Sequence, residues 1–138
     1  MQVGRLDHYT LRVEPEALPA LRAFYVEVLG LREGVRPDFV FPGHWLYADG
    51  KAVVHLAGLG RADASAGATG PLDHISMVAS DLGTTRAHLG RLGIEWREAP
   101  VPGTALHQIF LRDPCGLMLE LTFDLAAESA PVAQMAAP

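Results

Sequence analysis

The chain has 138 residues, of which 49% are hydrophobic, and a formal net charge of −5. This length suits one domain, or two small halves packed as one, with enough apolar side chains for a core. The negative charge and the lack of a Lys/Arg cluster argue against nucleic acid and anionic membranes as partners. A single cysteine excludes an internal disulfide, and the N-terminus shows no apolar signal segment, so we expect a cytoplasmic protein.

Hydrophobic periodicity predicts the elements of the first half in chain order. Residues 5–13 alternate between apolar and polar side chains and predict a strand, and residues 17–29 carry apolar side chains at helical spacing. Three short strands should follow, at 31–36, 45–48 and 52–57, with Asp49-Gly50 as a hairpin turn between the last two. Residues 59–70 are small and polar and predict a linker.

The second half repeats this plan. A strand at 72–79 leads to a helix at 81–92, which Ser80 or Asp81 should cap. Three further strands are predicted at 94–97, 106–111 and 117–123. Residues 125–138 are rich in Ala and Pro without periodicity, and we expect them to form a flexible tail.

Short motifs also recur between the halves. The triplet Leu-Asp-His ends at His8 and again at His74, which is 66 positions later. Each repeat also ends alike, and there His55 and Glu120 occupy equivalent positions that are 65 apart. A duplicated unit with a metal-capable side chain at both its start and its end suggests a metal site shared between two modules.

Strand parity places these four residues on one kind of surface. His8 alternates with apolar Tyr9 and Leu11, and Glu120 lies between Leu119 and Leu121, so both should point away from the helix-covered face. Each module reads βαβββ, and two such modules predict an α+β fold. We expect a concave mixed β-sheet cup with the helices outside and all four candidate ligands facing the cup.

At this point the sequence resembles the vicinal oxygen chelate superfamily, which includes glyoxalase I, type I extradiol dioxygenases, fosfomycin-resistance enzymes and bleomycin-binding proteins. The resemblance covers about residues 4–124. It rests on Leu-Asp-His-Tyr-Thr-Leu, Phe-Tyr followed by Val-Leu-Gly-Leu, Leu-Asp-His-Ile, and Asp-Pro-x-Gly leading to Leu-Glu-Leu. It implies a single domain over residues 1–124 with the glyoxalase/dioxygenase fold, made of modules at about 4–58 and 71–124.

The resemblance also implies that the metal ligands are His8, His55, His74 and Glu120. Imidazoles with one carboxylate suit one divalent transition metal such as Fe, Mn, Ni, Co or Zn. Burying Glu120 between leucines is costly unless it is paired or bound to a metal. His55 has three possible roles, which are fourth ligand, catalytic acid–base group and hydrogen-bond partner of another site residue, and we slightly favour the ligand.

Six further residues are predicted to line the substrate pocket: Thr10, Arg12, Trp45, Tyr47, Gln108 and Phe110. Arg12 is a candidate anion contact, with a surface role at a strand end as the alternative. Trp45 and Tyr47 belong either to the core or to an aromatic pocket wall. Gln108 and Phe110 share the parity of the cup.

The resemblance implies a metal-dependent enzyme acting on a small molecule with vicinal oxygens. Extradiol-type ring cleavage is the first choice, although such enzymes usually carry Tyr where this chain has Phe110. A glyoxalase I-like lyase or isomerase is the alternative, weakened because that chemistry uses a carboxylate where this chain has His55. A non-catalytic bleomycin-type binding protein is a further alternative. Exposed sheet edges also predict a homodimer.

Overall fold

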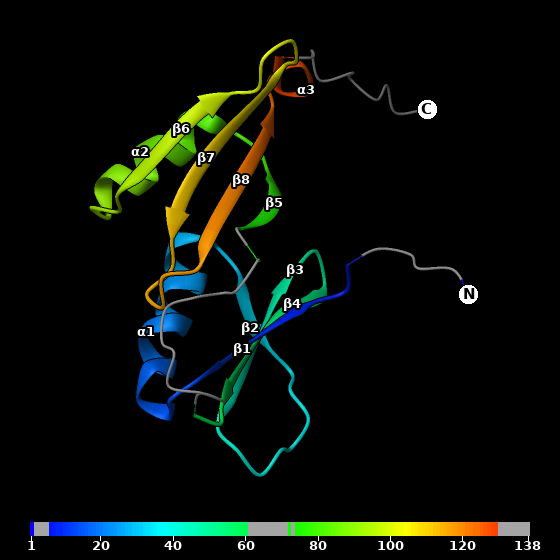
Figure 1. The fold of residues 1–138 in the computed structure, drawn as a ribbon, viewed down its shortest axis with the longest axis vertical. Helices are drawn as coiled ribbons and strands as arrows, with labels where there is room; N and C mark the ends of the chain where they lie inside the picture. The colour runs from blue at the N-terminus through cyan, green and yellow to red at the C-terminus, as the bar shows by residue number, and fades with distance from the viewer. Residues whose placement is uncertain (2–5, 61–71, 73, 130–138) are drawn as a thin grey trace, which may run out of the picture. The chain divides into compact units, whose positions relative to one another are not determined.

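The computed structural model describes residue 1, residues 6–60, residue 72 and residues 74–129 (Figure 1). It divides into two compact units, residues 1–70 with 113–116, and residues 71–112 with 117–138. We call them unit 1 and unit 2 and describe each by itself. From residue 61 on, the predicted linker lies outside the described residues.

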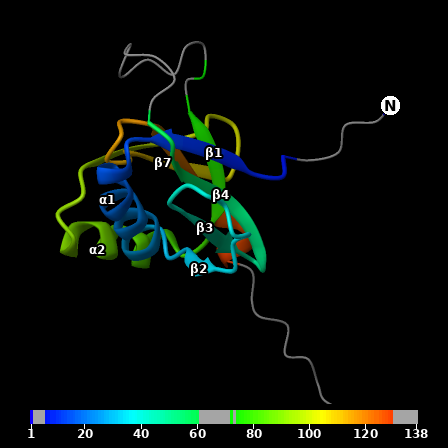
Figure 2. The same cartoon turned by 90° about the horizontal axis from the view of Figure 1, so that it is seen from below.

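Unit 1 holds a four-stranded mixed sheet in the order β1-β4-β3-β2. The strands are β1 (Tyr9–Val13), β2 (Arg32–Gly34), β3 (Gly43–Ala48) and β4 (Lys51–Gly58). β1 is parallel to β4, and the other neighbours are antiparallel. The predicted helix consists of a 3-10 turn η1 (Pro15–Ala17), helix α1 (Leu18–Ala23) and a π-helical turn η2 (Phe24–Val28), and α1 lies along one face of the sheet (Figure 2).

Two turns of unit 1 follow the chemistry of their residues. Asp49 and Gly50 both have positive φ, 48° and 75°, which is the conformation that a two-residue hairpin between β3 and β4 requires. Gly30, with φ of 71°, follows the helical segment, where the N–H of Leu31 donates to the carbonyl of Tyr25 at 3.0 Å. The predicted hairpin and helix end are therefore confirmed.

The core of unit 1 lies between the helix and the sheet. Its fully buried side chains are Leu21, Tyr25, Leu46, Val54 and Leu56. Along β4 the buried Val54 and Leu56 alternate with His55, which lies on the opposite face. We call the sheet face away from the helix the open face, and use the same term for unit 2.

Unit 2 repeats the arrangement, with strand order β5-β8-β7-β6 and β5 parallel to β8. Its strands are β5 (Ile75–Ala79), β6 (Trp96–Pro100), β7 (Leu106–Arg112) and β8 (Met118–Asp124). Helix α2 (Leu82–Arg91) is capped by Asp81, whose carboxylate accepts the N–H of Thr84 at 3.0 Å. Its fully buried side chains are Leu89, Ile109, Leu111, Leu119 and Phe123. Two such βαβββ units confirm the α+β fold class.

The end of the described chain contains a helix that the sequence reasoning did not foresee. Helix α3 (Leu125–Ser129) occupies the start of the predicted flexible tail. Asp124 explains it, because its carboxylate accepts the N–H groups of Ala126 and Ala127 at 3.0 and 3.2 Å and so caps the first turn. Residues 130–138 lie outside the described residues.

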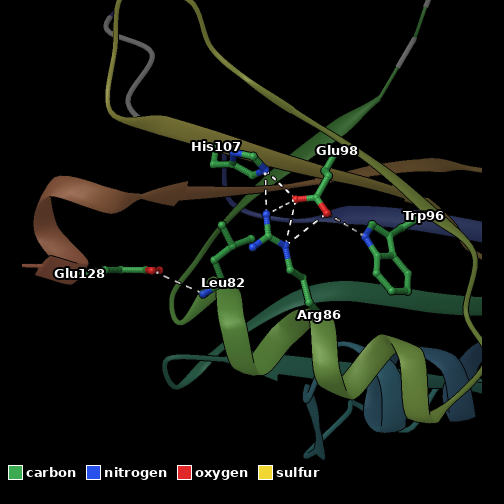
Figure 3. Close-up of polar contacts among 6 residues, drawn as sticks. All are labelled: Leu82, Arg86, Trp96, Glu98, His107 and Glu128. Carbon is green, nitrogen blue, oxygen red and sulfur yellow. Dashed lines mark hydrogen bonds and ion pairs between the residues drawn. The ribbon is translucent and has the colours of Figure 1, made fainter.

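In each unit a polar cluster links the helix to the sheet, and the two clusters consist of the same residue types. In each, an arginine of the helix and a histidine of the third strand share one glutamate of the second strand. The residues are Arg22, Glu33 and His44 in unit 1, and Arg86, Glu98 and His107 in unit 2 (Figure 3). Hydrogen bonds, first from Arg86 and then from His107 and Trp96, hold the pKa of Glu98 at about 2.

Candidate functional site

The predicted ligands of unit 1 lie together on its open face. Strand pairing places Thr10 and Trp45 on either side of His55, and His8 immediately precedes β1. The His55 ring is stacked between two others, with centroid distances of 4.0 Å to His8 and 4.0 Å to Trp45. The His55 and Trp45 rings are parallel to within 4°. The structure therefore holds His55 in one orientation.

His55 carries an unusual nitrogen. Its ring hydrogen-bonds to the carbonyl of Ala52, while Nε2 is buried with no hydrogen-bond partner among the described residues. Nδ1 is therefore the donor, and Nε2 keeps its lone pair. Burial, followed by the nearby His8, lowers the pKa of His55, and Ala52 and Asp7 oppose this only in part. A neutral imidazole with one nitrogen anchored on a carbonyl is the usual form of a metal-binding histidine.

The His8 ring is oriented by the preceding residue. Its Nδ1 lies 2.8 Å from Oδ2 of Asp7. A carboxylate on one ring nitrogen directs the other toward a ligand and raises its basicity. The sequence reasoning did not assign Asp7 a role, although its recurrence before His74 was a signal; the equivalent Asp73 lies outside the described residues.

The predicted ligands of unit 2 also lie together. His74 Nε2 is 3.3 Å from Oε2 of Glu120, whose side chain is 8% exposed. The hydroxyls of Ser76 and Thr122 donate to Oε1 of the same carboxylate at 2.7 and 2.8 Å. Parallel pairing of β5 with β8 accounts for this cluster, because it aligns Ser76 with Glu120.

The surroundings of Glu120 keep it ionised. Burial raises the pKa of its carboxyl, but hydrogen bonds from Ser76 and Thr122, the charge of His74 and a hydrogen bond from Gln108 outweigh it, so the pKa is lowered. Sequence reasoning expected Glu120 to be paired or metal-bound. The structure supplies the pairing, and it leaves a charged carboxylate on the open face.

The pocket residues predicted in unit 1 have different surroundings. Thr10 is exposed on the open face next to His55. Arg12 donates from Nε to the carbonyl of Gly60 at 2.7 Å, and from a terminal nitrogen to that of Leu59. Trp45 stacks on His55, as described above. The Tyr47 hydroxyl donates to the carbonyl of Val35 at 2.6 Å. Arg12 and Tyr47 therefore hold neighbouring backbone.

In unit 2, Gln108 and Phe110 share the open face with the ligand pair. Phe110 is aligned with Glu120 on β8 and meets the His74 ring edge-on, at a centroid distance of 6.2 Å. Sequence reasoning missed Arg97, whose guanidinium lies 4.0 Å above the centre of the Phe110 ring. The predicted strand at 94–97 ended at this residue, so its pairing with Phe110 was not considered.

Each unit supplies two donors of the kinds that bind a metal ion. Within the described ranges, no three His, Cys, Asp or Glu side chains come together as a metal site. The four predicted ligands instead form two pairs, one in each unit. The buried lone pair of His55 Nε2 and the ionised Glu120 are the kinds of donor that a divalent transition metal takes.

Comparisons with known proteins place this fold. The family model of the Glyoxalase/Bleomycin resistance protein/Dioxygenase superfamily matches residues 5–121. In a search of the curated proteins, none matches the chain. No helix in the described part of the chain is long and apolar enough to cross a membrane.

Solved structures share the fold at low sequence identity. A glyoxylase/bleomycin resistance protein/dioxygenase domain from Frankia sp. has a TM-score of 0.69 and 21% identity, covering 89% of this chain and 93% of its own. Lactoylglutathione lyase from Agrobacterium tumefaciens has a TM-score of 0.66 and 20% identity, with 91% and 98% covered. A fosfomycin resistance protein from Listeria monocytogenes has a TM-score of 0.67 and 17% identity, with 94% and 100% covered.

At these identities the structures establish the fold alone. The family model adds the evidence of sequence, because it spans both repeats and includes His8, His55, His74 and Glu120. The chain belongs to the glyoxalase/bleomycin resistance protein/dioxygenase superfamily.

Proposed function

We propose that this protein is a metal-dependent enzyme acting on a small molecule with vicinal oxygens. In this proposal His8 and His55 from unit 1 and His74 and Glu120 from unit 2 hold one divalent transition metal. The observation that carries it is the buried Nε2 of His55, which has no partner among the described residues. Such a group costs about 1–3 kcal/mol when it is unsatisfied, and a bound ion would remove that cost.

The pair in unit 1 would have to rearrange to bind. An imidazole nitrogen offers its lone pair in the plane of the ring, so two rings that share an ion cannot stay stacked at 4.0 Å with only 21° between their planes. His8 is the ring that would move, because it precedes β1 and its side chain is 38% exposed, and its contact with Asp7 would move with it. His55 stays between Ala52 and Trp45.

When bound, the ion would polarise a substrate oxygen and stabilise negative charge on it. The protein residues would do the rest. Asp7 orients His8, Ala52 sets the tautomer of His55, and Ser76 and Thr122 hold the Glu120 carboxylate in its charged form.

The number of ligands bears on the reaction class. Four protein ligands would leave the ion fewer positions for substrate than three ligands would. A ring-cleaving dioxygenase needs a further open position for its second substrate. We therefore favour a redox-neutral lyase or isomerase of the glyoxalase type over the dioxygenase preferred from the sequence.

Extradiol-type ring cleavage is the second candidate, and one observation favours it. The lowered pKa of His55, caused first by burial, leaves a neutral imidazole that can accept a proton at neutral pH. In that case His55 would be the acid–base group, and His8, His74 and Glu120 would be the only ligands.

The variant His55→Ala separates the two candidates. As a ligand, His55 should contribute at least roughly tenfold to metal affinity. We would measure Ni²⁺ and Mn²⁺ binding through Trp45 emission in a Trp96→Phe background, since the chain has only two tryptophans. Because His55→Ala also removes the Trp45 stacking partner, elemental analysis of the same samples gives an independent reading.

The matched control is His44→Ala. His44 lies on β3 and is bonded to Glu33, and it is not one of the four proposed ligands. This variant should leave metal binding unchanged. If His55→Ala keeps the metal but loses turnover, together with a limb of the pH–rate profile below the ordinary imidazole pKa of about 6.5, the acid–base role is correct. If metal and activity both persist, His55 has neither role.

A further inference from the structure

Unit 2 contains a hollow of about 520 Å³ beside the start of β6 and the end of β7. Its lining includes Arg97, Phe110 and Met118, which register places on the open face, together with Glu95 and Arg112. The hollow therefore combines an aromatic ring and a thioether with charged side chains. Such a mixture suits a small ligand that has a flat apolar part and a polar end.

The hollow adjoins the ligand pair of unit 2. Phe110 belongs to both, since it lines the hollow, is aligned with Glu120 and meets the edge of the His74 ring. A substrate whose oxygens lie at His74 and Glu120 could therefore extend over Phe110 into this hollow.

Arg97 differs from Arg22 of α1 and Arg86 of α2. Arg22 and Arg86 each pair with a glutamate. Arg97 stacks on Phe110, and among the described residues no carboxylate pairs with it. A stacked guanidinium keeps its N–H groups available at its edge, where they match the two oxygens of a carboxylate.

A simpler explanation is that Arg97 protects an edge strand, because β6 lies at the edge of its sheet and charged side chains discourage edge pairing. That role needs only a charge exposed to water. It does not account for the stacking of the guanidinium on a ring that also lines the hollow and adjoins Glu120.

We propose that this hollow is a substrate subsite that binds a planar carboxylate, with Arg97 pairing the carboxylate and Phe110 and Met118 contacting the flat carbon framework. The subsite rests on the proposed function in one respect, that the molecule it holds also presents oxygens to His74 and Glu120. The proposed subsite makes the substrate an anionic, planar compound. A neutral analogue of the same shape should bind less tightly than the carboxylate.

Benzoate and its neutral isostere benzamide test the subsite on the full chain without metal. Titrations followed by ¹H–¹⁵N NMR should show benzoate shifting the amides of Arg97, Phe110 and Met118. Benzoate should bind roughly tenfold more tightly than benzamide, as expected for a charge-assisted pair. Arg97→Gln should abolish this preference, and Arg97→Lys should retain part of it.

The matched control is Arg91→Gln, which removes the same charge from the end of α2, where Arg91 contacts His88. It should keep the preference for benzoate. Equal affinities for benzoate and benzamide in the unsubstituted protein, or an undiminished preference in Arg97→Gln, would overturn the subsite.

A second probe keeps the subsite distinct from the metal proposal. Added Ni²⁺ should tighten binding of 3,4-dihydroxybenzoate, which has vicinal oxygens, and should leave benzoate unaffected. If Ni²⁺ has no effect on either while benzoate is still preferred to benzamide, the metal proposal fails and the anion subsite stands.

Discussion

Two carboxylates are buried among the described residues, Asp113 and Glu120, and their surroundings differ. Asp113 accepts the hydroxyl of Tyr25 at 3.0 Å and the N–H of Cys115 at 2.9 Å, within the turn that joins β7 to β8. Those contacts fix a turn and place the carboxylate away from the open face. Glu120 is satisfied by side chains of the open face, which keeps it charged beside His74. We therefore expect Asp113 to stabilise the fold, whereas Glu120 remains a proposed functional residue.

Removing the Tyr25 hydroxyl should destabilise the protein. Tyr25→Phe leaves a buried Asp113 with one donor fewer, and the free energy of unfolding should fall by about 1–3 kcal/mol. Urea denaturation measures this change. Tyr47→Phe removes a hydroxyl that donates to an accessible loop carbonyl and should cost clearly less. Equal losses from the two variants would show that burial of Asp113 is not the cause.

For single residues, the sequence predicted the sheet face on which a side chain lies better than it predicted the hydrogen-bond partners of that side chain. Alternation along β8 placed Glu120 opposite Leu119 and Leu121, because strand parity depends only on local geometry. It could not show that Ser76 also satisfies the carboxylate, since that contact depends on the register between β5 and β8. The burial of Asp113 was also hidden, because an Asp-Pro-x-Gly turn normally indicates an exposed position.

The helices and edge strands are joined by the duplicated Arg–Glu–His clusters. Glu98 accepts from Arg86 and lies 2.6 Å from His107 Nε2, and Glu33 is bonded to Arg22 and His44 in the same way. Because the clusters lie on the helix side, they stabilise each unit without occupying its open face. Sequence periodicity predicted the helices and strands that they join, but short-range patterns carry no information on such long-range pairs.

The cluster predicts a pH-dependent stability. The pKa of Glu98 is lowered from 4.5 to about 2, so its contribution is fully present above the unfolded value and is lost as pH falls through about 2. Glu98→Gln should therefore lower the free energy of unfolding at neutral pH by about 1 kcal/mol or less, given solvent screening.

Denaturation across a pH series measures the difference in the free energy of unfolding between the unsubstituted protein and Glu98→Gln. This difference should vanish as the pH falls through about 2. Glu95→Gln, in the hollow of the same unit, is the control and should show a smaller difference at neutral pH. A loss in Glu98→Gln that stays constant down to about pH 2 would contradict the assignment.

The chain consists of two similar units, and the predicted metal ligands come from both of them. Each unit is a βαβββ module with its own core, and each contributes one pair of predicted ligands. His8 and His74 occupy equivalent positions in the two units, and so do His55 and Glu120. The sequence repeat predicted one metal site shared between the two modules, and the meeting of the four residues at one ion stays a prediction.

The edge strands lead us to expect a homodimer. Strands β1, β2, β5 and β6 each lie at an edge of a sheet, and Val78 on β5 is almost fully exposed. Light scattering coupled to size exclusion should give about twice the chain mass of 14.8 kDa. A single-chain mass that does not change with concentration would refute the dimer.

X-ray absorption spectroscopy of the Ni²⁺-loaded full chain counts the imidazole and carboxylate ligands, and so tests the proposal that His8, His55, His74 and Glu120 bind one ion. We expect about one ion per chain, with three imidazoles and one carboxylate at about 2.0–2.2 Å. The imidazole count should fall to two in His55→Ala, and Glu120→Ala should lose the carboxylate and weaken retention of the ion. Identical spectra and metal content in the unsubstituted protein and both variants would contradict it.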